Sequence, residues 1–459
     1  MGFAKLGVMD LSELYRKKEL SPVEYAKDMA QRIESENYNA IVTFDKNLCM
    51  KYAKESEKRY LEGEPLSMMD GVPIGIKDII DTKEIRTTYG CNAYKEHYPK
   101  EDAFAVKQLL KAGANVSVKT NTCQFAMGPT GEVSFAGPVK NPSNPKHVTG
   151  GSSSGSASAV RANLVPCALG TDSGGSIRLP SALTGVIGLK PTFGLVSNQG
   201  VMPVCESVDV VGPMTRNVVD NALVLSTIAG YNELDWRSAP YPKQDYTQKI
   251  GDDAVGRIAI GVDFLKEPID PFVKQGFEMA VRLLRKVGYE TEEKSLGDLS
   301  ELRQCHQILM MASAHYVHKK EIEQYRSDVY DQVYRRLCSG DVTSDRHIYN
   351  ELNKHEMIRR MNEAMQGFDF FIHPTTPLLA CKIGEGEKEI KIGAYMVNPF
   401  LTYGQNTWIA SYCNWPSINI PTGENEDGLT AGLCIIARPY KEKELYQIGD
   451  LLLKLVKNN

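Results

Sequence analysis

The sequence predicts an α/β fold built as one large domain. Helical patterns and short β-branched apolar runs alternate along most of the 459 residues, and this alternation is typical of α/β proteins. No segment has the composition and setting of an interdomain linker. A chain of this length can form either one domain with a large interior or several ordinary domains. We expect a single domain over residues 1–459.

The first 121 residues predict two helices, a buried segment and a helix–strand unit. "SPVEYAKDMAQRIES" (21–35) has a serine N-cap, a proline at the first helical position and a glutamate three residues after the serine. A second helix is expected over 47–62. "MMDGVPIGIKDII" (68–80) is an apolar run interrupted by Gly and Pro, which predicts a strand or loop inside the protein. Residues 103–121 predict a helix followed by a strand.

The segment 123–203 is poor in charge and rich in Gly, Ser, Thr, Ala and Pro. Within it, "VTGGSSSGSASAV" (148–160) has the composition of a flexible linker, but the sparse charge indicates burial instead. A P-loop would need Lys and then Ser or Thr after Gly155, and the sequence has Ser156 and Ala157 there. "GSSSG", centred on Ser153, fits the nucleophile-elbow pattern, but two prolines in the preceding "KNPSNPKHVT" argue against the strand that this motif requires.

Further helices and strands are expected in the rest of the chain. The pattern predicts helices in "NVVDNALVLSTIAG" and "FVKQGFEMAVRLLRKVGYE", a strand in "RIAIGVDF" and long charged helices over 301–366. "FDFFIHPTTP" (368–377) and "SINIPTG" (417–423) predict buried strands that end in turns.

Composition excludes several classes of function. A net charge of -4 gives no basic field for nucleic acid or an anionic membrane. The ten cysteines form no C-x-x-C pair, so we expect reduced, buried thiols and no zinc motif. The eight histidines lack metalloprotease spacing. The N-terminus has no signal-peptide pattern, and no apolar run is long enough to span a membrane, so we expect a cytoplasmic protein.

Two serines and one lysine are candidates for nucleophilic catalysis. Ser152 and Ser176 lie in glycine-rich segments, and Lys77 lies in "GIKD" between isoleucines. A serine hydroxyl needs a nearby base, and a lysine whose pKa is lowered by burial can serve as one. The glycines would let backbone N–H groups converge on one point, as an oxyanion hole requires. The alternatives are a surface role for Lys77 and a helix N-cap role for Ser176.

The motifs "GVPIGIKD", "GPVKNP", "GGSSSGSASAV" and "GTDSGGSIRLPSALTGVIGLKPTFGLVS" closely resemble those of the amidase signature family of Ser-cisSer-Lys hydrolases. "KTN", "NAIVTF", "HPTTP" and "INIPTG" extend the resemblance over most of the chain. The resemblance implies a single α/β/α domain in which helices cover a central mixed β-sheet, with the catalytic signature core at about 68–215.

By this resemblance, Ser176 is the nucleophile, Ser152 follows a cis peptide bond and relays protons, and Lys77 is the neutral base. The implied oxyanion hole consists of the backbone N–H groups of Ser173, Gly174, Gly175 and Ser176. No metal or organic cofactor is implied. Around these groups we expect Ser153 to be a structural hydroxyl, and Asp172 and Arg178 to form a buried ion pair that shapes the loop.

The expected substrate pocket departs from that of the similar glutaminase subunits of tRNA-dependent amidotransferases. "TNTCQFAMGPT" (120–130) differs from the matching segment of those subunits, which flanks the substrate. We therefore expect Gly128, Pro129 and Thr130 in this segment to contact the substrate. Arg336 matches an arginine that binds the glutamine carboxylate, or is a solvated helix residue. Lys441 occupies the position at which those subunits have an acidic residue that binds the glutamine amino group. A cation there would repel an ammonium group.

Aromatic residues are also frequent near the expected pocket. Trp408, Tyr412 and Trp415 lie where relatives have small apolar residues, and they either narrow the pocket or pack in the core.

The leading hypothesis is an amidase that works alone on a small-molecule amide and releases a carboxylate and ammonia or an amine. As an alternative, the chain is the glutaminase subunit of an amidotransferase, which would require partner subunits. A third hypothesis is an inactive scaffold. Beyond the substrate we expect no nucleic-acid or membrane partner, and a homodimer is compatible with the sequence.

Overall fold

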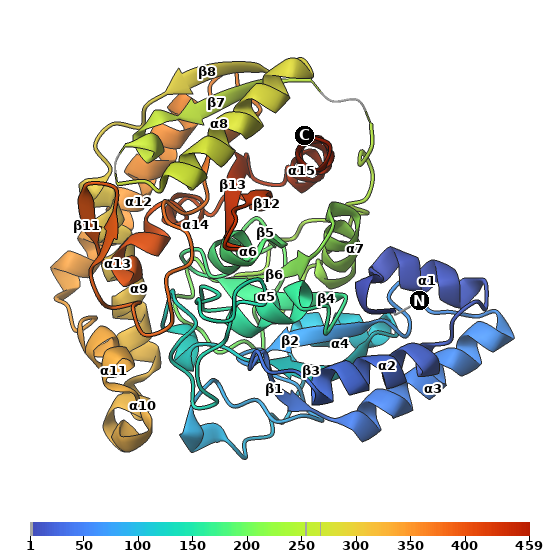
Figure 1. Ribbon diagram of the computed structural model, residues 1–459. Helices are drawn as coiled ribbons and strands as arrows, with labels where there is room; N and C mark the ends of the chain where they lie inside the picture. The colour runs from blue at the N-terminus through green and yellow to red at the C-terminus, as the bar shows by residue number, and fades with distance from the viewer. Residues whose placement is uncertain (1–2, 253–254, 267) are drawn as a thin grey trace.

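Eleven β-strands form one sheet through the middle of the molecule (Figure 1). This computed structural model describes residues 3–252, 255–266 and 268–459. The strand order is β1-β3-β2-β4-β6-β5-β12-β13-β9-β7-β8. The bounds are β1 Ile41–Phe44, β2 Pro73–Lys77, β3 Asn115–Thr120, β4 Cys167–Asp172, β5 Ile187–Lys190, β6 Val210–Thr215, β7 Arg257–Gly261, β8 Glu290–Lys294, β9 Phe370–Pro374, β12 Ser417–Glu424 and β13 Thr430–Ala437. A separate hairpin joins β10 Ile390–Ile392 and β11 Tyr395–Val397.

The sheet is mixed, as the resemblance implied. Strand β2 is parallel to β3 and β4, and β7 is parallel to β8 and β9. The other neighbouring pairs are antiparallel. The N-terminal and C-terminal halves of the chain meet where β5 pairs with β12, with Leu189 opposite Ile418.

Helices cover both faces of this sheet. The larger ones are α1 Val8–Arg16, α2 Pro22–Glu34, α3 Lys46–Glu62, α4 Phe104–Lys111, α5 Ser154–Arg161, α6 Arg178–Thr184, α7 Val218–Ile228, α8 Pro271–Lys286, α9 Ser300–Val317, α11 Asp331–Cys338, α12 Ser344–Ala364 and α15 Glu442–Lys457. Shorter helices are α10 Lys319–Gln324, α13 Pro399–Thr402 and α14 Trp408–Tyr412.

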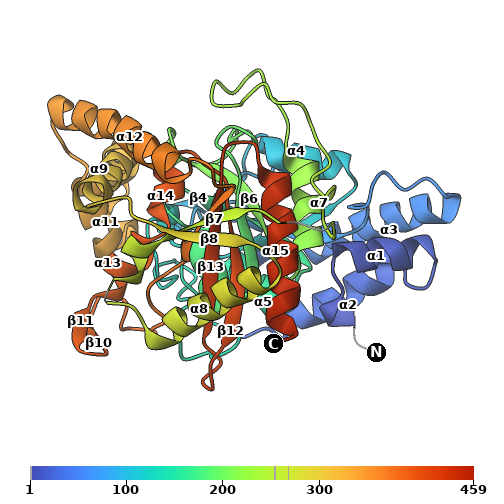
Figure 2. The same cartoon turned by 90° about the horizontal axis from the view of Figure 1, so that it is seen from above.

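The two faces of β12 show how the layers are built. Side chains alternate along a strand, and Ile418 and Ile420 face Gly449 of α15, while Asn419 lies on the side of α6, near Ala182. Helix α5 shares the α6 side, since it contacts α6 and β4. Figure 2 shows α1, α2 and α3 at one end of the molecule and α9, α11 and α12 at the other.

Most predicted elements are present with small shifts at their ends. Helix α2 begins with the expected capping box, in which the Ser21 hydroxyl accepts from the Glu24 N–H at 3.1 Å. The run 68–80 contains β2, all five residues of which are buried. Residues 103–121 form α4 and β3, joined through Gly113 at φ +84°.

The Gly/Ser-rich segment is part of the interior. Helix α5 begins at Ser154, and its residues 154–160 are all buried. The small residues of this helix let it pack closely against its neighbours. At Gly155, for example, an added Cβ would lie only 2.3 Å from the backbone nitrogen of Asn121. The sparse charge of the segment therefore reflects burial, as predicted.

All ten cysteines are free thiols, and nine of them are buried. No helix in the described ranges has both the length and the apolar character that crossing a membrane requires.

Candidate active site

Lys77, the last residue of β2, is fully buried beside two hydroxyl groups. Ile76, Ile79 and Ile80 around it are also inaccessible to solvent. The Lys77 ammonium donates hydrogen bonds to Ser152 Oγ at 2.8 Å and to Thr171 Oγ1 at 2.7 Å. Burial lowers the pKa of Lys77 to about 7, although the acidic groups of Cys123, Asp172 and Asp209 oppose the shift. A substantial fraction of neutral amine is therefore available near neutral pH.

Ser152 lies in the loop that precedes α5. The peptide bond between Gly151 and Ser152 is cis. The Ser152 carbonyl accepts from the Thr122 hydroxyl at 3.0 Å, and Ser153 exchanges hydrogen bonds of 3.2 Å with the backbone of Thr171. This loop is thus tied to β4 and to the segment after β3.

The second serine, Ser176, lies between β4 and α6, and it is partly accessible. It is not a helix N-cap, since Ile177 takes that position. The Ser153 N–H donates to the Ser176 carbonyl at 3.2 Å and so joins the two serine loops. Within the described ranges, no hydrogen bond links the Ser152 and Ser176 hydroxyls directly.

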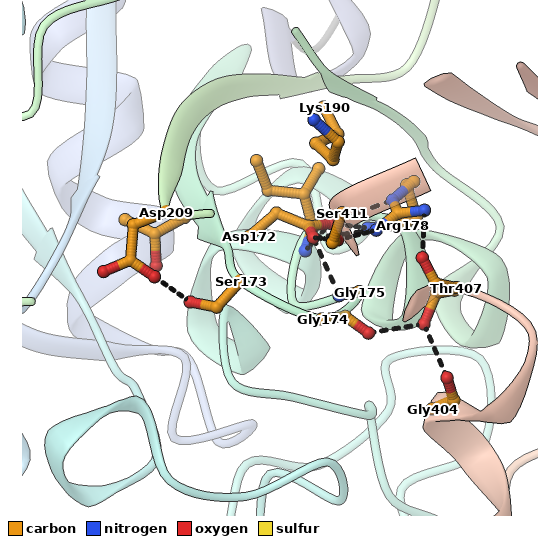
Figure 3. Close-up of polar contacts among 12 residues, drawn as sticks. Asp172, Ser173, Gly174, Gly175, Arg178, Lys190, Asp209, Gly404, Thr407 and Ser411 are labelled. Carbon is orange, nitrogen blue, oxygen red and sulfur yellow. Dashed lines mark hydrogen bonds and ion pairs between the residues drawn. The ribbon is translucent and has the colours of Figure 1, made fainter. Parts of the chain in front are cut away.

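A buried ion pair shapes the Ser176 loop (Figure 3). The Arg178 guanidinium binds both carboxylate oxygens of Asp172, at 2.8 and 3.0 Å, and both side chains are fully buried. Burial would raise the pKa of Asp172, but Arg178 outweighs it and holds this pKa at about 2. Arg178 also donates to the Thr407 carbonyl and the Ser411 hydroxyl. Asp172 and Arg178 thus form the buried pair that the sequence predicts, and the Arg178 contacts also fasten the loop to α14.

The predicted oxyanion-hole residues lie in this loop, but their N–H groups are not equivalent. The Gly175 N–H donates to Asp172 Oδ1 at 2.7 Å, so it is already occupied. The N–H groups of Ser173, Gly174 and Ser176 have no acceptor among the described residues. The Thr407 hydroxyl donates to the Gly174 carbonyl at 2.7 Å, which orients the neighbouring peptide group (Figure 3).

Asp209 supports the same loop from the other side. It accepts a hydrogen bond from the Ser173 hydroxyl and further ones from the N–H groups of Val204 and Cys205, at 2.8 and 2.9 Å. Burial raises the pKa of Asp209 to about 6.

A cavity of about 460 Å³ opens in front of Ser176. Its floor consists of residues 173–176 and Gly151, and one wall is the loop 126–129. Helix α9 supplies a second wall, and Phe400, Leu401, Gly404, Gln405 and Trp408 supply the remainder. Among the described residues that line it there is no Asp or Glu.

Four of the six predicted substrate-binding residues line this cavity: Gly128, Pro129, Arg336 and Trp408. The Arg336 guanidinium lies 4.6 Å from the ring centroid of Phe400. Burial lowers the pKa of Arg336 to about 10, so the side chain remains charged at neutral pH. Thr130 is buried behind the lining, while Tyr412 and Trp415 pack in the core.

The prediction for Lys441 is wrong. This residue immediately precedes α15, its side chain is 55% exposed, and its ammonium lies 3.4 Å from Glu444. It does not line the cavity. The short motif near the C-terminus carries no information about where α15 begins or which way its first residues face. The positive charge of the cavity comes from arginines instead.

Sequence reasoning missed several lining residues and one hydroxyl at the base. Thr171 contacts Lys77 and directly precedes Asp172. Arg303, His306, Gln307 and Met310 line the cavity from α9. Their spacing of three, one and three residues places them on one face of a helix. This spacing was the only feature of the sequence that could have indicated a shared surface. Nothing local, however, indicates that α9 packs against a loop about 130 residues earlier.

The family match and the shared fold place the protein among the hydrolases of carbon–nitrogen bonds. The amidase family model matches residues 24–446, and the chain belongs to this family. It is an amidase-signature amidohydrolase.

Its relatives have several functions. The chain is 33% identical to a glutamyl-tRNA(Gln) amidotransferase subunit of Staphylococcus haemolyticus (strain JCSC1435), with 96% of this chain and 95% of that protein aligned. The native peptide amidase from Stenotrophomonas maltophilia superposes with a TM-score of 0.84 at 26% identity, over 99% of this chain and 98% of that one. A structure described as a vestigial protein complex that reveals the origins of an s-triazine catabolic enzyme gives a TM-score of 0.92 at 25% identity, with 98% of both chains covered.

Proposed function

We propose that the protein hydrolyses a small carboxylic amide, without partner subunits, through Lys77, Ser152 and Ser176. The observation that carries this proposal is the contact of 2.8 Å between Lys77 Nζ and Ser152 Oγ in a fully buried setting. A neutral amine can accept the Ser152 proton while it still donates to Thr171. Ser152 can then accept the proton of Ser176, since catalytic hydrogen bonds often tighten only when substrate binds.

The reaction proceeds in two halves. Ser176 Oγ forms a bond to the amide carbon as its proton passes through Ser152 to Lys77, and the carbonyl oxygen becomes an oxyanion. The carbon–nitrogen bond then breaks, and the departing nitrogen takes a proton back along the same path. Water attacks the resulting ester of Ser176 by the same route, which releases a carboxylic acid and regenerates the serine.

The oxyanion has three candidate donors, the N–H groups of Ser173, Gly174 and Ser176. We exclude Gly175 from this role in the resting state because its N–H is bonded to Asp172. Loss of one such donor typically costs about 100- to 1000-fold in kcat.

The cavity favours a substrate without a cationic group. Arg303 and Arg336 line it, and the described lining residues include no carboxylate to receive an ammonium group. This argues against free glutamine as the substrate. The identity of 33% to the amidotransferase subunit keeps the glutaminase role as the second candidate.

A substrate panel tests both candidates. The purified chain would be assayed with primary amides, anilides, ureas and glutamine, with Ser176→Ala as the inactive control. In a second assay, the labelling of both proteins by a fluorophosphonate would be followed. We expect turnover of small amides by the chain alone and labelling that is absent in Ser176→Ala. Glutamine hydrolysis that requires added amidotransferase partner subunits would instead support the second candidate. The absence of both turnover and labelling would contradict both.

A further inference from the structure

Helix α9 presents two polar side chains to the cavity that have no hydrogen-bond partner of normal geometry within the described ranges. The Nε atom of Arg303 and the Nε2 atom of His306 are both buried and unpaired. Buried polar groups in native proteins are nearly always satisfied. Of the buried atoms without a partner among the described residues, these two belong to ionisable side chains that line the cavity, three residues apart on one helix face.

Arg303 has no contact ion pair among the described residues. Asp263 and Asp298 are the nearest acidic influences on it, but Asp263 is already bonded to Lys266, Ser295 and the Leu296 N–H. Burial lowers the pKa of Arg303, yet a guanidinium remains protonated in proteins. The side chain thus brings a positive charge to the cavity wall without a matching carboxylate at hydrogen-bond distance.

His306 lies against the Ser176 loop. Its Cε1 atom is 3.3 Å from the position that a Cβ on Gly174 would occupy, and its ring packs 5.9 Å from Trp408 and 5.3 Å from Tyr412. The side chain is only 1% exposed. Burial lowers its pKa to about 3, although a polar contact with the backbone of Ser173 opposes the shift. It is therefore a neutral imidazole beside the expected position of the scissile carbonyl.

We propose that Arg303 and His306 form a second polar anchor, which binds a carboxylate of the substrate close to the amide that is cleaved. This inference rests on the proposed amidase function and names its substrate class: small amides that carry a carboxylate, such as the half-amides of short dicarboxylic acids. Arg303 supplies charge-assisted donors, and a neutral His306 adds one N–H donor. Both are specificity-determining groups and not part of the proton relay.

Three amides of similar size test the substrate class. We expect 4-amino-4-oxobutanoate, which carries a carboxylate, to be hydrolysed with a kcat/KM at least 10-fold higher than that of the neutral butanamide. The cationic 3-aminopropanamide should be the poorest of the three. Equal kcat/KM values for all three would overturn the inference while leaving the amidase function intact. No turnover of any amide and no fluorophosphonate labelling would instead refute the proposed function.

Substitutions test the residues. Arg303→Gln should raise KM for 4-amino-4-oxobutanoate at least 10-fold and lower the ratio of its kcat/KM to that of butanamide at least 10-fold, and Arg303→Lys should recover part of the loss. His306→Phe, which keeps an aromatic ring against Trp408, should have the same selective effect. The matched control is Arg282→Gln, an exposed arginine of α8 that does not line the cavity, and it should change neither KM.

Fluorophosphonate labelling of Ser176 in each variant reports a correctly folded site independently of the anchor. With labelling at the wild-type rate, an unchanged KM for the anionic amide in Arg303→Gln would overturn the proposal, as would an equal loss for the neutral amide. Binding of succinate to Ser176→Ala, measured by calorimetry, gives a second readout. This binding should weaken at least 10-fold when Arg303→Gln is added, and unchanged affinity would also contradict the anchor.

Discussion

Lys77 combines complete burial with two hydroxyl contacts and a pKa lowered to about 7. If it is the base, as we propose, this pKa sets the pH range of activity. Only the neutral amine can accept a proton, and the protonated form dominates below the pKa. We therefore expect kcat/KM for a neutral amide to fall about 10-fold per pH unit below pH 7 and to level off above it. A steady-state pH profile measures this. A profile that stays flat from pH 5 to 8 would contradict the role of Lys77 as the base.

The variant Lys77→Met completes this test, because it keeps an unbranched side chain of similar length and removes the amine. We expect kcat to fall by about 100- to 10,000-fold, the usual contribution of a general base. The control is Lys441→Met, an exposed lysine outside the cavity, which should retain wild-type kcat. Circular dichroism of both variants checks that they fold.

Burial of the Arg178–Asp172 ion pair makes the stability of the fold depend on both partners. The variant Arg178→Met leaves the Asp172 carboxylate buried without its partner, and breaking such a pair usually costs about 3–5 kcal/mol of unfolding free energy. Arg359→Met serves as control, since Arg359 pairs with Glu356 on the exposed side of α12. Urea denaturation should show a large drop in the midpoint for Arg178→Met and little change for Arg359→Met. Similar midpoints for the two variants would mean that the buried pair does not stabilise the fold.

At the scale of elements, the loop between β4 and α6 depends on one glycine. Gly175 has φ +128°, and a Cβ there would lie 2.0 Å from the Thr407 hydroxyl oxygen. Gly175→Ala should therefore displace both the Gly174 peptide group and Ser176. We expect kcat/KM to fall at least 100-fold, comparable to the loss of an oxyanion donor.

Gly63→Ala is the matched control for this loop, because Gly63 also has positive φ (+82°), but a Cβ added there would have no atom within 4 Å. It should cost about 1 kcal/mol of stability with unchanged kcat/KM. If Gly175→Ala retains activity to the same extent, the loop tolerates movement and its geometry does not control the reaction.

Local elements were predictable from the sequence where a local signal existed. The Ser-Pro-x-Glu start of α2 fixes its capping box, and the isoleucines around Lys77 indicate its burial. The cavity wall on α9 was not predictable in this way. Arg303 and His306 have ordinary helical spacing, and their role depends on a contact with the Ser176 loop that only the packing of distant segments creates. The prediction for Lys441 failed because that residue lacks such a contact.

At the scale of the whole molecule, β12 and β13 join the two halves of the sheet. They lie between β5, from the first half of the chain, and β9, from the second. Lys77 and Ser176 lie in the N-terminal half, whereas α9, α11 and α14 of the C-terminal half complete the cavity around Ser176. We therefore expect activity to require both halves to be folded, and neither half has a complete sheet by itself.

This architecture predicts a single cooperative unfolding transition, although chains of this size often unfold through intermediates. Loss of activity, far-UV circular dichroism and the fluorescence of Trp408 and Trp415, both 4% exposed, should share one urea midpoint.

As a matched test, a chain that ends before Ser417 lacks β12, β13 and α15 and should not fold, whereas the variant Arg282→Gln should unfold like the wild type. Separate midpoints for fluorescence and activity would show that the C-terminal half unfolds independently, and the sheet would then not be one cooperative unit.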